Sequence, residues 1–495
     1  MKQELFGHLK TFGQEHLLTF WDVLDTTERD DLAAQINAID FAQIAELYER
    51  RNEPAESLTL ADRASDPPAY KFSTVTDPTP CKTSKPITTG EAIKAGTEAL
   101  QNGKVAFALV AGGQGTRLGF PHPKGMYPLG PVSGATLFQF HFEKVLAIIR
   151  RYGHRVPYCI MTSPATHTET IDFLKDQNYF GLSADDVFIF CQGTMPAVSM
   201  EDGKVLLDSK SSIALSPDGH GGMLSAMAKG SPSVLTQLRQ RGIDYLFYNQ
   251  VDNPLVQIGS PEFLGYHLLS GSELTSQVIR KRLPNDKVGN IVEVDGRLYV
   301  IEYSDMPESV GQQTNPDGSL KIWAGSIAVH VFNIELLERA SQSATSLPFH
   351  YARKKVPFVE IKSGGHTLPG ARIKPDTENA IKFERFIFDL LPSAKNAVVV
   401  EVDPPNHYAP LKNAPGSATD SPETVKQDIS AMHTAWLQQA GAVVQQDTPI
   451  EISPLFADSP EAIAERIEKG RRFERATYLH DTSALPNRSF DSVDC

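Results

Sequence analysis

A glycine-rich stretch near residue 110 contains most of the residues that could do chemistry. It begins with an apolar run, Val105–Ala111, which predicts a buried strand. The residues that could bind a phosphate follow directly: Gly112, Gly113, Gly115, Arg117, Gly119 and Lys124. Glycines leave backbone N–H groups open to close approach, and the two cations add positive charge. This combination predicts a loop that binds a polyphosphate.

Two common phosphate-binding loops do not fit this stretch. In the dinucleotide fingerprint Gly-x-Gly-x-x-Gly, Leu118 would stand at the third glycine, which disfavours a nicotinamide dehydrogenase. In the triphosphate-binding loop with Gly-Lys-Ser/Thr, the residues after Lys124 are Gly125 and Met126 instead. The plain alternative is a tight turn with two surface cations. The coincidence of several glycines and two cations in one loop favours phosphate binding.

Strands and helices alternate around this loop and would position its residues. We expect strands at Val105–Ala111, Val156–Thr162, Val187–Cys191 and Ile243–Asn249, and helices at Thr136–Tyr152 and Ala165–Lys175. This alternation predicts the α/β class, with a mostly parallel sheet covered by helices. Ligands bind beyond the carboxyl ends of such strands. The glycine-rich loop, Gln192 and Asp252 all stand at or just past these ends.

The chain before this core is predicted to be mostly helical. Apolar residues recur at helical spacing over residues 1–65, with the charged segment Asp25–Asp31 expected to join two helices. Ser65–Lys85 is rich in Pro, Ser and Thr, which predicts an extended crossing segment. Thr88–Leu100 again predicts a helix. We therefore expect an N-terminal, mostly helical domain over residues 1–95.

The chain changes character after residue 270. Thr275–Arg282 and Asn290–Tyr303 are β-rich, and Asp295-Gly296 is typical of a hairpin turn. Together they predict an antiparallel excursion that forms one wall of the pocket. The later expected elements are a strand at Ala397–Val402, a helix from Ser421 to Gly441, a β-like stretch at Ala442–Ser453, a helix from Ser459 and a loose end over the last dozen residues. We expect a catalytic domain over residues 96–400 and a small C-terminal α+β domain over 401–495.

The composition limits the class of protein. Of 495 residues, 41% are hydrophobic and 22% are charged, as in ordinary globular proteins. Lys plus Arg (47) against Asp plus Glu (60) gives a net charge of −13, which argues against a general nucleic-acid or membrane-surface binder. An anionic substrate would then need a local positive pocket. Four scattered cysteines, no metal-ligand spacing and no long apolar run predict a cytoplasmic protein.

The sequences GGQGTRLG and PKGMY within the loop resemble the signature of the nucleotide-sugar pyrophosphorylases of the UDP-glucose-pyrophosphorylase superfamily. They are most similar to the UDP-N-acetylglucosamine pyrophosphorylase branch, and the resemblance extends through most of the chain. It implies a nucleotidyltransferase core with a Rossmann-like, GT-A-like mixed sheet. It further implies nucleotide binding by Ala111, Gly112 and Gly113, and catalytic roles for Arg117, Lys124 and Lys412, the lysine of the segment PLKNA.

Other segments resemble the family at the uracil base and at the metal. Gln192, in CQGTMPAV, matches the glutamine that pairs with uracil, and an amide both donates and accepts as the uracil edge requires. Gly219, in DGHGG, matches a glycine that contacts the nucleotide. Asp252, in the segment VDN, matches a carboxylate at the metal and phosphate site, which implies Mg²⁺. The plain alternatives are a polar strand-end residue for Gln192, a capping residue at a strand end for Asp252, and an ordinary surface turn for the segment of Gly219.

The sugar-binding segments match the family less completely. The resemblance implies a sugar-binding set of Gly289, Glu302, Tyr303, His220 and Ser326. His220 stands where the N-acetylglucosamine branch usually has Asn. The UDP-glucose and broad UDP-sugar branches have His at this position. Ser326 and Val329 replace two further Asn, the first of which contacts the sugar in the family. The segment Phe383–Asp389 also matches, and its apolar spacing predicts a buried helix face.

Together these residues predict a uridylyltransferase. It would join UTP and N-acetyl-α-D-glucosamine 1-phosphate by in-line attack of the sugar phosphate on the α-phosphate, with Mg²⁺ as cofactor. The alternatives are glucose or galactose 1-phosphate as the sugar, and a non-catalytic nucleotide-sugar sensor. Retention of the four charged residues Arg117, Lys124, Asp252 and Lys412 argues against the sensor. The expected partners are UTP and a sugar 1-phosphate, with no nucleic acid and no membrane, and a monomer is favoured.

Overall fold

The computed structural model describes residues 1–53, 56–71, 86–343, 346–361 and 370–481. They group into two units: a smaller unit of residues 1–58, 192–226 and 343–390, and a larger unit of residues 59–191, 227–342 and 391–495. The predicted crossing segment Ser65–Lys85 lies partly outside the described residues, and the predicted loose end lies wholly outside them. The division into three domains at residues 95 and 400 stays a prediction.

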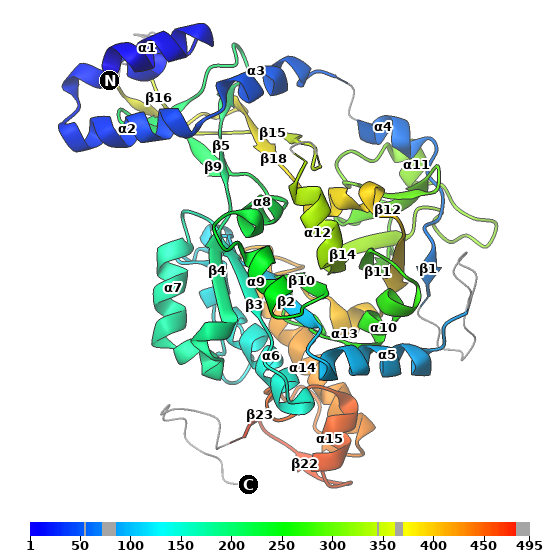
Figure 1. Ribbon diagram of the computed structural model, residues 1–495. Coiled ribbons are helices and arrows are strands. Elements are labelled where there is room, and N and C mark those ends of the chain that lie inside the picture. The colour runs from blue at the N-terminus through cyan, green and yellow to red at the C-terminus, as the bar shows by residue number, and fades with distance from the viewer. Residues whose placement is uncertain (54–55, 72–85, 344–345, 362–369, 482–495) are drawn as a thin grey trace. The chain divides into compact units, whose positions relative to one another are not determined.

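The larger unit is built around a ten-stranded sheet (Figure 1). In spatial order, the strands of its main path are β1 (Ala69–Tyr70), β19 (Ala397–Glu401), β11 (Leu274–Arg280), β14 (Ala324–Asn333), β10 (Tyr245–Gln250), β2 (Val105–Val110), β3 (Tyr158–Thr162) and β4 (Val187–Cys191). Neighbours on this path are parallel except at β14, which runs antiparallel to both β11 and β10. The predicted mixed, mostly parallel sheet is confirmed.

A hairpin extends the sheet beside β14. It consists of β12 (Gly289–Val294) and β13 (Arg297–Ile301), joined at Asp295 and Gly296, whose φ angles of 51° and 79° suit a tight hairpin turn. This part of the predicted excursion is confirmed. The assignment of Thr275–Arg282 to the same excursion was wrong, because β11 lies inside the main sheet between β19 and β14. A buried central strand and an excursion strand have the same β-rich composition.

Local capping signals set the ends of the helices. The helices of the larger unit include α5 (Thr89–Gln101), α6 (Leu137–Tyr152), α7 (His167–Asp176), α9 (Val234–Gln240), α10 (Pro261–Leu269), α11 (Glu308–Gly311), α12 (Ile334–Ser341), α13 (Pro404–His407), α14 (Pro422–Gln439) and α15 (Pro460–Arg466). Thr136 caps α6, Ser421 caps α14 and Ser459 caps α15 through side-chain hydrogen bonds. These predicted helix starts are confirmed. None of the described helices combines the length and the hydropathy that a membrane-spanning helix requires.

One apolar core joins the sheet to the C-terminal part of the chain. Phe107 of β2 and Phe247 of β10 pack edge to face, and Phe247 packs in the same way on Phe263 of α10. Ile429 and Trp436 of α14 belong to this cluster. The short parallel pairs β20 (Val443–Val444) with β22 (Arg472–Phe473) and β21 (Ile450–Ile452) with β23 (Thr477–Leu479) complete this part. The C-terminal segment therefore shares its core with the sheet.

The smaller unit combines N-terminal helices with short strands. Its elements are α1 (Lys2–Thr11), α2 (Thr26–Ala38), α3 (Phe41–Arg50), β5 (Thr194–Pro196), β6 (Val198–Ser199), β7 (Leu207–Ser209), β8 (Ser212–Ile213), β9 (Leu215–Pro217), β15 (His350–Lys354), β16 (Phe358–Val359), β17 (Arg372–Ile373) and β18 (Ala380–Glu384). Leu9, Leu32 and Phe383 lie in one buried cluster. Two short helices, α4 (Glu56–Ala61) and α8 (Gly222–Ala228), span unit borders along the chain.

Two sequence predictions about this unit were wrong. Asp25–Asp31 does not join two helices, because Asp25 caps α2 in a capping box with Glu28 and the charges fall in the first turns of that helix. Acidic residues are favoured there by the helix dipole. Phe383–Asp389 is not one helix face, since β18 ends at Glu384 and a 3-10 helix begins at Ile387. Although the apolar spacing suits a helix, the first part of this segment forms a strand because it pairs with β15.

Candidate active site

The loop after β2 folds back on itself through backbone hydrogen bonds. Gly115 N donates to His122 O at 2.9 Å, and Lys124 N donates to Gly113 O at 3.0 Å. A Cβ at Gly115 would lie 2.8 Å from Phe120, so the packing requires glycine. A Cβ at Gly113 would meet nothing within 4 Å, and Gly113 is exposed. The backbone at Gly113 is therefore open to a ligand.

Ala111 and Gly112, the other predicted nucleotide-binding residues of this loop, are tied to the sheet. Ala111 is fully buried, and its N–H donates to Met161 O at 2.8 Å. Gly112 O accepts a hydrogen bond from Ser163 Oγ at 2.7 Å. These bonds fix the point at which the chain leaves β2 and turns into the loop.

Two segments that are far apart in the sequence meet this loop. Lys124 Nζ donates to Leu411 O at 3.3 Å, and Leu411 N donates to Asp252 O at 2.8 Å. Lys412 Nζ donates to Tyr408 Oη at 3.1 Å. The structure thus brings together the predicted Lys124, Asp252 and Lys412. With Asp420, described below, we call these residues the charged cluster.

The charges of the cluster act on one another. Burial lowers the pKa of Lys124; Asp252 opposes this effect, while Lys412 and Arg117 lower the pKa further. Burial also acts on Lys412, but Tyr408 and Asp252 hold its pKa above the ordinary value. Arg117 is exposed on the same loop, in the 3-10 helix Thr116–Leu118. A polyanion bound among these cations would relieve their mutual repulsion.

Asp420 is a member of the cluster that sequence reasoning missed. Its carbonyl accepts from Lys412 N and Asn413 N, both at 2.9 Å. Burial raises the pKa of its carboxyl group, Lys412 opposes this effect, and Asp252 adds to it. Asp420 lies outside the PLKNA segment and adopts a left-handed φ of 54°. No motif or spacing pointed to it, because the turn of the chain after Asn413 brings it back to Lys412.

Asn253, beside Asp252, is a second residue whose role the sequence did not reveal. Its Nδ2 donates to His407 O at 2.8 Å, and its Oδ1 accepts from Ala409 N at 3.1 Å. The side chain is almost fully buried. Asn253 therefore fastens the segment that leads to Lys412 onto the loop after β10.

The cluster fits a magnesium ion that is shared with a substrate. Among the described residues, no three His, Cys, Asp or Glu side chains converge as a metal site made of protein ligands alone. Asp252 and Asp420 are close enough to influence each other electrostatically. One or two carboxylates suit Mg²⁺ when phosphate oxygens and water supply its other ligands.

Three of the predicted sugar-binding residues meet at the base of the β12–β13 hairpin. Gly289 pairs with Ser326 across β12 and β14. A Cβ at Gly289 would lie 3.2 Å from Glu302 Oε1, so glycine lets this carboxylate approach the strand. Tyr303 is 47% exposed. Lys287, two residues before Gly289, lowers the pKa of the carboxyl group of Asp420, so the charge of the turn that leads into β12 acts on the charged cluster.

The remaining predicted site residues, Gln192, Gly219 and His220, belong to the smaller unit. Gln192 directly follows β4 and is buried. Gly219 has a φ of 83°, and a Cβ there would lie 2.4 Å from Arg385 O. Both its backbone conformation and its packing therefore require glycine.

His220 is held by the aromatic residues of its own unit. Its Nδ1 accepts from Ile387 N at 3.2 Å, and its ring stacks on Phe386 with centroids 5.1 Å apart. Burial, with a contribution from His350, lowers the pKa of His220 to about 4. His220 is thus neutral near pH 7, with its proton on Nε2. These contacts give His220 a structural role in packing the smaller unit. A contact of His220 with a sugar stays a prediction.

Comparison with known proteins identifies the family. The family model described as UTP–glucose-1-phosphate uridylyltransferase matches residues 73–450. The chain is 34% identical to UDP-N-acetylglucosamine diphosphorylase 2 of Arabidopsis thaliana, over 95% of this chain and 92% of that protein. It is 32% identical to UDP-N-acetylglucosamine pyrophosphorylase of Saccharomyces cerevisiae, over 94% of this chain and 96% of that protein.

A solved structure shows the same fold. It is the uridine diphosphate N-acetylglucosamine pyrophosphorylase of Trypanosoma brucei in complex with an inhibitor, with a TM-score of 0.79 and 24% identity. The match covers 97% of this chain and 98% of that one. The predicted nucleotidyltransferase-like α/β fold is confirmed. This chain belongs to the UTP–glucose-1-phosphate uridylyltransferase family.

Proposed function

We propose that this chain transfers the uridylyl group of UTP to N-acetyl-α-D-glucosamine 1-phosphate, giving UDP-N-acetylglucosamine and diphosphate. One observation carries the proposal: Lys124 and Lys412 converge on Asp252 beside the open backbone of Gly113. The family supports the reaction type, and relatives with matches over most of their length are named for N-acetylglucosamine.

The chemistry needs positioning and charge neutralisation rather than an activated protein nucleophile. The attacking group is a phosphate oxygen of the sugar 1-phosphate, which is already anionic at neutral pH. It forms a bond to the α-phosphorus of UTP while the bond to the β-phosphate oxygen breaks, and diphosphate leaves. Arg117, Lys124 and Lys412 would hold the two polyanions in line and neutralise the charge that develops between them.

Asp252 is the residue that we propose to hold Mg²⁺, with Asp420 beside it. A bound magnesium ion would supply positive charge to the phosphates of UTP. Asp252 lies two residues past β10, at the carboxyl end of a strand next to β2. Its carboxylate and the cations Lys124 and Lys412 would therefore act on the same phosphate groups.

The binding roles at the base and the sugar are part of the same proposal. Ala111, Gly112, Gly113, Gln192 and Gly219 would bind the nucleotide, with the Gln192 amide on the uracil edge. Gly289, Glu302, Tyr303, Ser326 and His220 would bind the sugar. The Glu302 carboxylate can accept hydrogen bonds from sugar hydroxyl groups. Cytoplasmic location and a monomeric state stay predictions.

The choice of sugar is tested by measuring diphosphate release from UTP and Mg²⁺ with a panel of sugar 1-phosphates. We expect the highest kcat/KM with N-acetylglucosamine 1-phosphate. A preference for glucose or galactose 1-phosphate would contradict the proposed sugar and would make Ser326 and His220 the candidates for specificity. UTP binding without turnover of any sugar would favour a nucleotide-sugar sensor over an enzyme.

A further inference from the structure

Two basic side chains of α6 hold the loop that carries Asp252. Three carbonyl groups of this loop accept their hydrogen bonds: Val251 O from His141 Nε2 at 3.0 Å, Val256 O from Lys144 Nζ at 2.8 Å, and Pro254 O also from Lys144 Nζ. His141 and Lys144 are three residues apart in a helix and therefore share one face. Asp252 lies between the points that they hold.

The same loop is hydrogen-bonded to the segment that carries Lys412. Asp252 O accepts from Leu411 N at 2.8 Å, directly before Lys412. The buried Asn253 side chain binds both His407 O and Ala409 N, as described above. Gln257 Nε2 adds a hydrogen bond to Asn406 O at 3.2 Å. A shift of the loop would therefore move the carboxylate and the lysine of the charged cluster together.

Both donors sit in surroundings that disfavour charge. His141 is fully buried, and burial lowers its pKa to about 3, so the ring is neutral and donates through Nε2. Burial lowers the pKa of Lys144 to about 7, and Asp458 opposes this effect. A buried polar group costs free energy unless it is hydrogen-bonded, and an apolar residue at either position would avoid that cost. What His141 and Lys144 provide, and apolar residues could not, is the set of hydrogen bonds to the loop.

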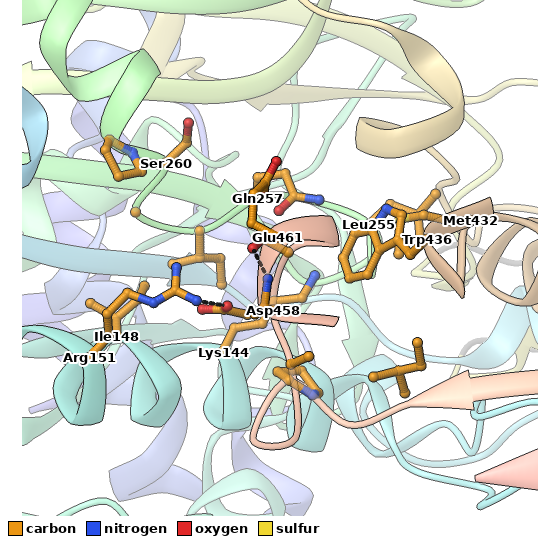
Figure 2. Close-up of a pocket in the computed structure, with 18 of the residues that line it drawn as sticks. Lys144, Ile148, Arg151, Leu255, Gln257, Ser260, Met432, Trp436, Asp458 and Glu461 are labelled. Carbon is orange, nitrogen blue, oxygen red and sulfur yellow. Dashed lines mark hydrogen bonds and ion pairs between the residues drawn. The ribbon is translucent and has the colours of Figure 1, made fainter. Parts of the chain in front are cut away.

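A cavity of about 690 Å³ opens beside Lys144 (Figure 2). Figure 2 shows Lys144 next to the ion pair of Arg151 with Asp458, and Leu255 and Trp436 also line the cavity. The cavity lies within the larger unit, between α6, the loop after β10 and the C-terminal helices. Lys144 lines this cavity, so a small molecule could reach the position of its Nζ from this side.

We propose that Lys144 and His141 are positioning residues for the transfer reaction, which hold Asp252 and Lys412 in register through the loop of residues 251–257. The inference rests on the proposed function. Neither side chain needs to touch a substrate, since both act through backbone carbonyl groups. The same contacts predict that losing either donor loosens the loop and the Lys412 segment together.

The first test compares Lys144→Met and His141→Leu with the wild-type chain. We expect kcat to fall on the order of 10- to 100-fold, with a higher Mg²⁺ concentration needed for half-maximal rate and little change in KM for the sugar 1-phosphate. Hydrogen exchange at residues 409–413 should become faster. His141→Gln, which can still donate to Val251 O, should keep most of the activity.

Lys104→Met is the matched control. Lys104 Nζ also donates to a backbone carbonyl, Gly242 O at 3.3 Å, but it lies just before β2, at the end of the strand opposite the loop. This variant should leave kcat, the Mg²⁺ requirement and the exchange at residues 409–413 unchanged. An equal effect of both lysine variants would overturn the inference, because it would show a general loss of stability.

Chemical rescue tests the role of the Lys144 Nζ donor itself. Lys144→Ala removes the atoms from Cγ to Nζ, and propylammonium supplies the same atoms through the adjacent cavity. We expect propylammonium, but not 1-propanol, to restore kcat and slow exchange at residues 409–413 in Lys144→Ala, with no effect on Lys104→Met. Equal restoration by 1-propanol would mean that Lys144 only fills space.

The outcomes separate this inference from the proposed function. If the wild-type chain releases diphosphate but Lys144→Met keeps its kcat, its Mg²⁺ requirement and its exchange pattern, the inference alone is wrong. If the wild-type chain releases no diphosphate with any sugar 1-phosphate, the proposed function is wrong and the catalytic part of the inference falls with it. The exchange measurement then reports whether α6 holds the loop at all.

Discussion

Lys124 Nζ donates a hydrogen bond to Leu411 O at 3.3 Å and so joins two residues that are 287 positions apart. Leu411 N in turn donates to Asp252 O. The glycine-rich loop, the end of β10 and the PLKNA segment are therefore parts of one hydrogen-bonded arrangement. In such an arrangement, the cations have fixed positions before a substrate arrives.

Lys124→Ala should reduce catalysis far more than nucleotide binding. Lys124 would neutralise charge that grows in the transition state, so we expect kcat to fall on the order of 100-fold. The dissociation constant for uridine nucleotides, measured by calorimetry, should change only a few-fold, because Gln192 and Gly219 would still bind the base. Steady-state kinetics with N-acetylglucosamine 1-phosphate gives the first quantity.

Lys175→Ala provides the control for this prediction. Lys175 is an exposed lysine in the last turn of α7, and its loss should change neither quantity. Equal losses of kcat and of nucleotide affinity in Lys124→Ala would show that Lys124 binds the ground state and the transition state alike.

Gly113→Ala should impair UTP binding without harming the fold. A Cβ at Gly113 meets nothing within 4 Å and the residue has no left-handed φ, so the folded chain has room for a methyl group. The phosphates of UTP would approach this backbone, and the methyl group would obstruct them. We expect KM for UTP to rise about tenfold, which corresponds to about 1.4 kcal/mol.

Gly90→Ala, at a glycine with similar open space in the first turn of α5, is the matched control. It should leave KM for UTP unchanged and raise the free energy of unfolding by up to about 1 kcal/mol. An unchanged KM for UTP in Gly113→Ala would remove Gly113 from the nucleotide-binding set.

Local signals explain which parts of this fold could be predicted. Thr136 and Ser421 mark helix starts because a cap depends only on the next three residues. Asp295-Gly296 marks the hairpin because both residues tolerate a positive φ. The position of β11 in the middle of the sheet left no local trace, since strand order depends on crossovers between distant segments.

The residues of the candidate site also fall into those that the sequence predicted and those that only the structure revealed. Lys124, Asp252 and Lys412 were predicted from segments of distinctive sequence, and the structure brings them together. Asp420 and Lys144 stand in no such segment. Asp420 reaches the cluster through a turn, and Lys144 reaches the loop after β10 from the middle of a helix. Only tertiary structure reveals contacts of this kind.

Ser326→Asn should increase the preference for N-acetylglucosamine 1-phosphate. Ser326 faces Gly289 at the base of the hairpin. The N-acetylglucosamine branch, which the sequence resembles, has Asn at the position of Ser326. An Asn amide can donate to the carbonyl group of an N-acetyl substituent, so we expect kcat/KM for N-acetylglucosamine 1-phosphate over glucose 1-phosphate to rise roughly tenfold. Diphosphate release with both sugars measures this ratio.

Ser326→Leu separates hydrogen bonding from size. Leu has the same number and branching of side-chain heavy atoms as Asn but no amide, so it fills at least as much space and should not raise the ratio. If both variants raise the ratio equally, the effect comes from filling space, and a direct contact with the acetyl group would be wrong.

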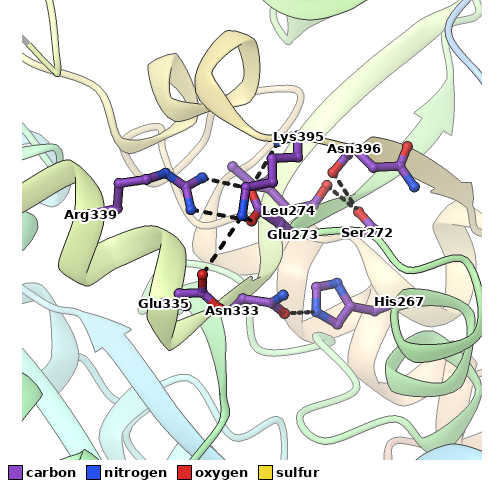
Figure 3. A network of polar contacts seen from close by, with 9 residues as sticks. All are labelled: His267, Ser272, Glu273, Leu274, Asn333, Glu335, Arg339, Lys395 and Asn396. Carbon is purple, nitrogen blue, oxygen red and sulfur yellow. Dashed lines mark hydrogen bonds and ion pairs between the residues drawn. The ribbon is translucent and has the colours of Figure 1, made fainter.

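A buried carboxylate at Glu273 joins β11, α12 and the segment before β19 (Figure 3). Arg339 Nη2 donates to it at 2.6 Å and Lys395 N at 2.9 Å. Burial alone would raise the pKa of Glu273, but Arg339 and Lys395 hold it below the ordinary value of 4.5. Because the folded pKa is lowered, this carboxylate stabilises the fold above pH 4.5, and the contribution is lost as the pH falls through the folded pKa.

Glu273→Gln should therefore lower the free energy of unfolding at pH 7 by about 1.5–3 kcal/mol, the range for hydrogen bonds to charged groups. Denaturant titration at several pH values should show the difference from wild type shrinking below pH 4.5. Glu335→Gln is the control, because Glu335 is 65% exposed and lies 3.7 Å from Lys395, so its loss should cost less than about 0.5 kcal/mol. A difference for Glu273→Gln that stays constant down to pH 3 would show that shape, and not the charge of Glu273, stabilises this part of the sheet.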